Sequence, residues 1–393
     1  MYYRLTILFL LIFNLSYSAT FEEILQKAIK NSPYLKSFEY QKNSYEGQIL
    51  KAKTLYNPQI DLEFGRLVSQ TESGFALTLF SISQQLRLWG EKDFAIKSAV
   101  LKKRAQEYFY NQQKNILAGQ LFQLFYEVLF LNEQIRIKEK ELKNLETLYS
   151  FIKKKYNLGD ALVVDVLRIE KDISIVKLQI ENLKAKKYAK ESYLFALAGI
   201  KPEKLEGDFY KFEDLQRIDL KDLPLLKYYK LLVKSYDEEI KRQKVLAKPQ
   251  ISVGFVASED AVSNGKYEFG ITISSTLPIF YKNQGQIINL INKKKQFLEK
   301  ERQYRLQYNA EIKSIYNQYR ILTSQFKKVD DLAIKKLEES LKIAELGYKE
   351  GTITFLELST IRKQYFEVLL YKAQLSYEIH RLYGEFIKLG GVR

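Results

Sequence analysis

An internal duplication constrains this chain more than any other feature of its sequence. Shifting the sequence by 191 residues places eight residues of the segment 44–60 on identical residues. The pairs are Ser44 and Ser235, Tyr45 and Tyr236, Ile49 and Ile240, Lys53 and Lys244, Leu55 and Leu246, Pro58 and Pro249, Gln59 and Gln250, and Ile60 and Ile251. At a shift of 192, Tyr156 and Gly159 meet Tyr348 and Gly351. We therefore predict two structural repeats, each with a helix, a hairpin, a long helix, a turn and a return helix.

Proline spacing indicates where long helices can form. The six prolines stand at positions 33, 58, 202, 224, 249 and 278, so two stretches of more than a hundred residues lack this helix breaker. Apolar residues spaced alternately by three and four predict coiled-coil seams. They are Val166, Ile169, Ile173, Val176, Ile180 and Leu183, and then Leu358, Ile361, Tyr365 and Val368. Continuous helices over 92–155 and 286–349 would each reach roughly 96 Å, too long for a compact domain.

Two segments alternate with a period of two and predict strands. Apolar residues alternate with polar or small ones at Ile60, Leu62 and Phe64, and at Tyr267, Phe269, Ile271 and Ile273. We expect hairpins over 58–85 and 250–276. Four strands cannot close a barrel or cover their own edges, so lipid-facing strands would require several chains to combine their hairpins. The alternative is a small soluble sheet packed on a helix.

The first residues resemble an export signal. Arg4 precedes an apolar run over 7–13, and Ser16-Tyr17-Ser18-Ala19 supplies the small residues of a cleavage site. We predict a cleaved signal peptide over 1–18, because the apolar run is too short to be a membrane anchor. The remaining boundaries follow from the duplication. They are a first repeat over 19–200, an equatorial linker over 201–222, a second repeat over 223–389 and a tail over 390–393.

Composition argues against several classes of function. The chain has no Cys and one His, so disulfides, thiolate zinc sites, a lipidated Cys and multi-His metal centres are excluded, and we expect no cofactor. No convergent set of catalytic residues is found, so we expect no enzyme, and His380 is expected to be structural. The net charge of +16 invites nucleic-acid binding, but runs such as Lys138-Glu139-Lys140-Glu141 alternate in sign, which is typical of a solvated coiled-coil face.

Each long helix is followed by a glycine turn. The turns are Tyr156-Asn157-Leu158-Gly159-Asp160-Ala161 and Tyr348-Lys349-Glu350-Gly351-Thr352-Ile353, with return helices over 162–198 and 354–388. Glycine permits the left-handed residue that ends a helix, and we expect Asp160 and Thr352 to cap the helices that follow.

These features together resemble the TolC family of outer-membrane efflux channels, over nearly the whole mature chain. The order of several motifs carries the resemblance. They are Asn57-Pro58-Gln59-Ile60, Lys248-Pro249-Gln250-Ile251, Gln84-Gln85-Leu86 with Gly90, Leu277-Pro278-Ile279-Phe280 with Gly285, Asp165-Val166-Leu167 and Glu357-Leu358.

The resemblance implies a mainly α fold with a small β part. Three chains would form one twelve-stranded transmembrane β-barrel, with four strands from each chain, continued by a coiled-coil α-barrel across the periplasm. It implies a passive exit duct of a tripartite efflux or type I secretion system, gated at its periplasmic tip. The implied partners are a periplasmic adaptor, an inner-membrane pump and outer-membrane lipid.

The resemblance also assigns roles to individual residues. Leu158, Gly159 and Asp160, with Glu350, Gly351 and Thr352, would be the adaptor-docking tips. Glu357 matches an acidic pore position, and Tyr348 matches a tyrosine of the gate. Thr360 and Ile353 depart from acidic and basic family positions. Asp165, the first-repeat counterpart of Glu357, faces either the pore or solvent.

The sequence leaves three alternatives at this level, which concern the function, the place of Trp89 and the cargo. A periplasmic coiled-coil adaptor or scaffold without a barrel is the alternative function, although an adaptor normally has one hairpin flanked by compact β domains. Trp89, the only tryptophan, belongs either to an interfacial belt or to the strand-to-helix junction. The cargo, whether drugs, metal ions or protein, is not specified by the sequence.

Overall fold

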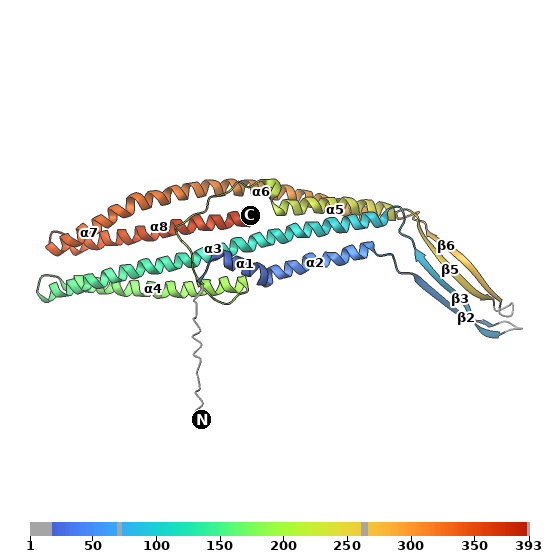
Figure 1. Ribbon diagram of the computed structural model, residues 1–393, viewed down its shortest axis with the longest axis horizontal. Coiled ribbons are helices and arrows are strands. Elements are labelled where there is room, and N and C mark those ends of the chain that lie inside the picture. Colours follow the sequence, from blue (N-terminus) through green and yellow to red (C-terminus); the bar gives the residue numbers. More distant parts are fainter. Residues whose placement is uncertain (1–17, 69–72, 261–265, 391–393) are drawn as a thin grey trace, which may run out of the picture. The chain divides into compact units, whose positions relative to one another are not determined.

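The computed structural model describes residues 18–68, 73–260 and 266–390, so the predicted signal peptide lies outside the described residues except for Ser18. The helices are α1 (Phe21–Asn31), α2 (Pro33–Lys53), α3 (Glu91–Asn157), α4 (Val163–Ala198), α5 (Pro224–Leu246), α6 (Gln284–Lys328), α7 (Lys335–Glu350) and α8 (Phe355–Leu389). The strands are β1 (Ser18–Ala19), β2 (Gln59–Val68), β3 (Ser73–Gln85), β4 (Lys204–Leu205), β5 (Gln250–Asp260) and β6 (Lys266–Thr276). Both halves run from a helix through two long strands to a long helical segment, a turn and a return helix (Figure 1).

The long helical segment of the second half differs from that of the first. Helix α3 is continuous over 67 residues. Between α6 and α7, in contrast, six residues adopt π-helical geometry in the segment η2 (Val329–Ile334). Lys372 Nζ of α8 lies 2.6 Å from Asp330 Oδ1 in this segment. The sequence pattern over 286–349 predicted the helix but not this local widening.

The chain divides into two compact units. Unit 1 is drawn from Met1–Lys36, Gln113–Ile218 and Ala310–Arg393, and unit 2 from Ser37–Gln112 and Asp219–Asn309. Unit 1 therefore contains both interhelix turns, and unit 2 contains the four long strands. A short 3₁₀ helix, η1 (Leu220–Asp222), leads into α5 of unit 2.

Unit 1 is held together by close packing of α3 against α8. Ala118, Phe122 and Ile387 form one buried cluster between these helices. Beside it the two backbones approach so closely that a Cβ atom on Gly119 would lie 2.4 Å from the carbonyl oxygen of Gly384. Glycine is required at this crossing because any side chain would fill the space that the partner helix occupies.

The segment between the repeats is fixed to unit 1 through its carbonyl groups. Ser376 Oγ donates to Phe209 O at 2.5 Å, and His380 Nε2 lies 3.0 Å from the same oxygen. Tyr319 OH donates to Glu213 O at 2.5 Å. His380 is buried and stacks on the ring of Tyr126 with centroids 3.6 Å apart, which agrees with the structural role expected for it.

The long strands form one antiparallel sheet in the order β2-β3-β5-β6. Its register places apolar side chains opposite one another across all four strands. One row is Ile60, Ile82, Phe255 and Ile271, and the next is Leu62, Phe80, Ala257 and Phe269. The alternate positions include Ser83, Gly254 and Thr272. The sheet therefore has one apolar and one more polar face, and among the described strands β2 and β6 are open edges.

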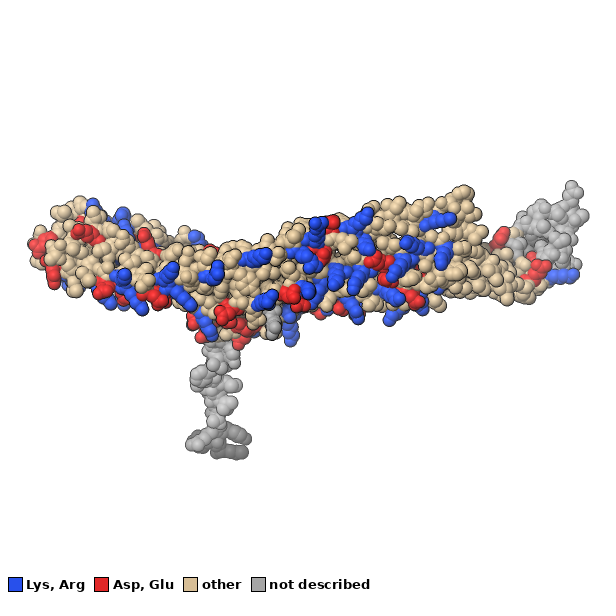
Figure 2. Space-filling model, turned by 90° about the horizontal axis from the view of Figure 1, so that it is seen from above, with Lys and Arg blue, Asp and Glu red and all other residues tan. Residues whose placement is uncertain are grey.

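The helical surface carries charges of both signs. On the face shown in Figure 2, basic and acidic side chains are interspersed along the helices. No helix in the described parts of the chain is both long enough and apolar enough to span a bilayer.

Candidate functional site: the two interhelix turns

The first turn closes through backbone hydrogen bonds around a left-handed glycine. Gly159 has a φ of +86°. The amide of Asp160 donates to Lys155 O at 2.8 Å, and the amide of Gly159 donates to Tyr156 O at 3.0 Å. These bonds satisfy carbonyls at the end of α3, so the chain reverses into α4 within a few residues.

The second turn uses the same device with one additional side chain. Gly351 has a φ of +78°, and the amide of Thr352 donates to Gly347 O at 2.8 Å. The hydroxyl of Thr352 donates to that same carbonyl at 3.0 Å. Thr352 therefore closes the end of α7.

The capping predicted for Asp160 and Thr352 is wrong. The N-cap of α4 is Leu162, which makes no side-chain cap. The N-cap of α8 is Thr354, whose hydroxyl accepts from the amide of Glu357 at 3.3 Å. The error has a local cause, because each glycine turn adds two residues before the next helix begins.

Glu357 completes a capping box at the start of α8. Its Oε2 accepts from the amide of Thr354 at 2.7 Å and from the hydroxyl of Thr354 at 2.9 Å. The backbone hydrogen bond, followed by the side-chain bond, lowers the pKa of Glu357. The predicted pore carboxylate is thus charged, exposed to solvent and fixed in direction by its own helix.

Tyr348 connects the two helical hairpins. It is buried, and its ring lies 6.0 Å from that of Phe151 in α3. Lys155 Nζ donates to the carbonyl of Tyr348 at 3.3 Å and lies 5.4 Å from its ring centroid. Burial raises the pKa of Tyr348, and the negative charge of Asp165 adds to this effect. The structure thereby brings Tyr348 and Asp165, predicted separately, into one neighbourhood.

The predicted docking residues form an exposed surface. Leu158, Gly159, Asp160, Glu350, Gly351 and Thr352 are all exposed, and Leu158 has 77% of its surface accessible. Large apolar side chains surround them. These are Tyr156, Leu162, Val163, Val164 and Leu167 on the first hairpin, and Ile343, Leu346 and Leu356 on the second. We call these residues the tip surface. Both turns lie at the same end of unit 1 (Figure 1).

Residues 24–200 match the family described as outer membrane efflux protein. The predicted resemblance to this TolC-like family is confirmed. None of the curated proteins matches the chain. The match covers most of the predicted first repeat.

Solved structures extend the likeness to almost the whole chain. VceC from Vibrio cholerae has 14% identity and a TM-score of 0.79, with 94% of this chain and 96% of that chain covered. CusC, described with its transmembrane channel formation, has 16% identity and a TM-score of 0.79, covering 95% and 92%. The open-state MtrE channel of Neisseria gonorrhoeae has 14% identity and a TM-score of 0.74, covering 94% and 89%. At such identities the likeness establishes the fold.

Several residues of this site were not found from the sequence. Lys155 follows Lys153 and Lys154, and nothing in the pattern distinguishes it as the one that reaches Tyr348. Phe151 and Phe355, whose rings flank Tyr348, carried no signal beyond apolar spacing. Only the folded arrangement of the two hairpins identifies them.

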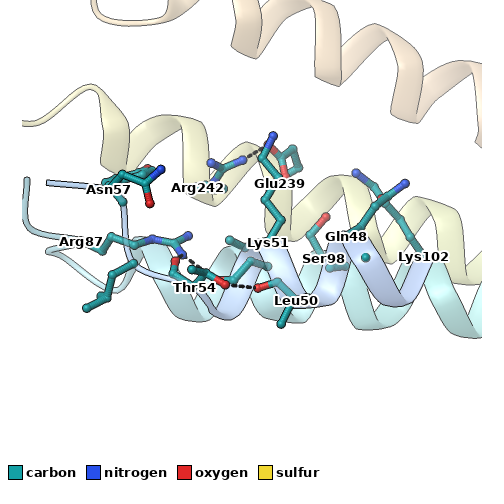
Figure 3. A pocket seen from close by; sticks show the side chains of 16 residues that line it. Gln48, Leu50, Lys51, Thr54, Asn57, Arg87, Ser98, Lys102, Glu239 and Arg242 are labelled. Atoms are coloured by element: carbon teal, nitrogen blue, oxygen red, sulfur yellow. Dashed lines mark hydrogen bonds and ion pairs between the residues drawn. The ribbon is translucent and has the colours of Figure 1, made fainter. Parts of the chain in front are cut away.

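A second polar centre lies in unit 2, next to the ends of the strand hairpins β2–β3 and β5–β6. Glu91 accepts from Arg87 Nε at 2.5 Å and from Arg242 Nε at 2.6 Å. Beside it a pocket of 700 Å³ opens between α2, α3 and α5 (Figure 3). The indole Nε1 of Trp89 donates to Pro249 O at 3.2 Å while half of the side chain stays exposed. Trp89 therefore packs at the strand-to-helix junction.

Proposed function

We propose that this chain is the outer-membrane exit duct of a tripartite efflux or type I secretion system. Three copies would combine their strands into a barrel in the outer membrane and their helices into a periplasmic tunnel. Transport would be passive, with a pump in the inner membrane supplying the energy. The leader predicted over residues 1–18 would direct export and be removed.

The observation that carries this proposal is the sheet of unit 2. Its apolar rows run across all four strands, and residues such as Ile271 and Phe269 have 78% and 70% of their surface accessible. Burying such side chains stabilises a structure by about 25 cal/mol per Å², so a soluble chain would cover this face. Lipid provides the cover, and strands of further copies would satisfy the open edges of β2 and β6.

The tip surface supports docking and gating at the periplasmic end of the proposed duct. We propose that Leu158, Gly159 and Asp160, with Glu350, Gly351 and Thr352, contact a periplasmic adaptor. We further propose that Tyr348, Glu357 and Asp165 belong to the gate. The contact of Lys155 with the carbonyl of Tyr348 joins the two hairpins, and adaptor binding would loosen it.

Planar-bilayer recording on the detergent-purified protein tests the duct directly. The proposal predicts stepwise ion currents, and extraction from membranes that requires detergent. A periplasmic scaffold would be released by salt alone and would give no current. Gly159→Val and Gly351→Val test the tips, because both positions have positive φ. We expect normal insertion with weakened adaptor crosslinking, and loss of insertion would count against the tip assignment.

A further inference from the structure

Arg362 is a buried arginine with unused donors. It lies in α8 of unit 1, and 2% of its surface is exposed. Its Nη2 donates to Asp172 Oδ2 of α4 at 3.2 Å, whereas Nε and Nη1 make no hydrogen bond with the described residues. A guanidinium has five N–H donors, and leaving charged donors unmet in a protein interior is costly. Such a group requires an additional acceptor.

A cavity beside Arg362 has room for that acceptor. It has a volume of 250 Å³ and is bounded by α3, α4 and α8. A water molecule occupies about 30 Å³ in the liquid, so the cavity accommodates a small ion together with part of its hydration shell. Apolar side chains, including Val176 and Phe366, form part of the wall. They lower the local polarity and strengthen any ionic contact made inside.

The charges around this cavity favour an anion. Its lining has four basic side chains and three acidic ones, which leaves one excess positive charge. They are Lys138, Lys171, Arg362 and Lys363, with Glu141, Asp172 and Glu367. Two of the acids are already engaged by lysines, because Lys138 Nζ lies 2.8 Å from Glu141 Oε2 and Lys171 Nζ lies 3.1 Å from Asp172 Oδ1.

We propose that this cavity binds a small monovalent anion, either one of the weakly hydrated halides chloride and bromide or the carboxylate of a small organic acid, through hydrogen bonds from Arg362. The anion neutralises the excess charge and accepts bonds that Asp172 leaves unmade. Because α3 and α4 belong to the first hairpin and α8 to the second, the bound anion also ties the two hairpins together. In the proposed duct, anion concentration would then set how firmly the hairpins that carry the tip surface are joined.

Thermal unfolding of the detergent-purified full chain tests the site. Chloride and acetate are titrated separately at constant ionic strength with fluoride, which remains strongly hydrated, as the balancing anion. The proposal predicts a saturable rise in Tm for at least one of them, following the linkage between ligand and stability. A rise with chloride alone identifies a halide site, and a rise with acetate alone identifies a carboxylate site. No saturable rise with either anion overturns the proposal.

Variants separate binding from general salt effects. Arg362→Gln should abolish the anion-dependent rise, and Arg362→Lys, which keeps the charge, should weaken it at least tenfold in anion concentration. Lys186→Gln is the control, because Lys186 is an exposed lysine of α4 outside the cavity lining, and its midpoint should change by less than threefold. An equal rise in wild type and Arg362→Lys overturns the proposal.

If neither Arg362 variant folds, a structure of the wild-type protein determined in the presence of bromide tests the site. Bromide beside Arg362 supports the site, and water alone, Glu141 or a second copy's carboxylate there overturns it.

Discussion

The capping box at the start of α8 allows two roles of Glu357 to be separated. Thr354 Oγ1 accepts from the amide of Glu357 at 3.3 Å, and Glu357 Oε2 accepts from the amide of Thr354 at 2.7 Å. Thr354→Ala removes the first bond together with the bond from the Thr354 hydroxyl to Glu357 Oε2, and it keeps the negative charge. Glu357→Gln removes the charge and keeps an amide oxygen as acceptor. One variant therefore changes the local fold and the other changes the electrostatics.

The expected size of the capping effect follows from the bond that is lost. Removing a threonine N-cap costs about 1 kcal/mol, which corresponds to about a fivefold increase in local opening of the second turn. The pKa of Glu357 is lowered by its bonds to Thr354. Its ionised form therefore stabilises the turn above the ordinary pKa of Glu, and this contribution is lost as the pH falls through the lowered value. Glu357→Gln should flatten that acid dependence.

Amide hydrogen exchange over residues 350–358 and single-channel recording with divalent cations measure the two effects. Thr354→Ala should increase exchange about fivefold and leave cation block unchanged. At neutral pH, Glu357→Gln should increase exchange less than Thr354→Ala does, because only the contribution of the charge is lost, and it should reduce cation block. Thr360→Ala is a matched control, because Thr360 Oγ1 donates to Leu356 O within α8 and takes no part in the capping box. If Glu357→Gln increases exchange like Thr354→Ala and leaves the currents unaltered, Glu357 is a cap and not a pore residue.

Three further predictions concern packing, pH and the sheet. Gly119→Ala should destabilise unit 1 by about 1–3 kcal/mol in thermal unfolding, whereas Gly47→Ala, where a Cβ meets nothing within 4 Å, should be neutral or stabilising. Burial lowers the pKa of His380 to about 4, so the folded state resists protonation, and stability should fall by up to about 3 kcal/mol as pH drops from about 6.5 to about 4. His380→Gln should remove that decline in acid-unfolding curves, and an unchanged decline would contradict the assignment. Ile271→Lys on the apolar face should impair membrane insertion by about 2–4 kcal/mol, while Ser274→Lys on the other face should insert normally in an outer-membrane fractionation assay; equal insertion would contradict a lipid-facing row.

The strands could be predicted because their chemistry is local. Alternation at Ile60, Leu62 and Phe64 requires only that one face of the chain is buried or lipid-facing. The pairing of β3 with β5, which joins the two hairpins into one sheet, joins segments far apart in sequence and has no local signal. The same holds for the π-helical segment Val329–Ile334, whose residues are compatible with an ordinary helix.

The glycines of the turns were predictable, but the partners of the side chains were not. Gly159 and Gly351 adopt positive φ as expected. The caps were assigned two residues too early, because sequence does not show how many residues the turn consumes. Lys155 and Arg362 act on the other hairpin, at separations of 193 and 190 residues. Contacts of that kind depend on the tertiary packing of the hairpins.

The native mass of the detergent-solubilised protein tests the central claim most directly. In the proposed duct, strands from further copies complete a sheet that has two open edges and an exposed apolar face. We predict a mass of three chains with bound detergent, and monomer only after unfolding. A single chain that stays folded and dissolved without detergent would contradict the account.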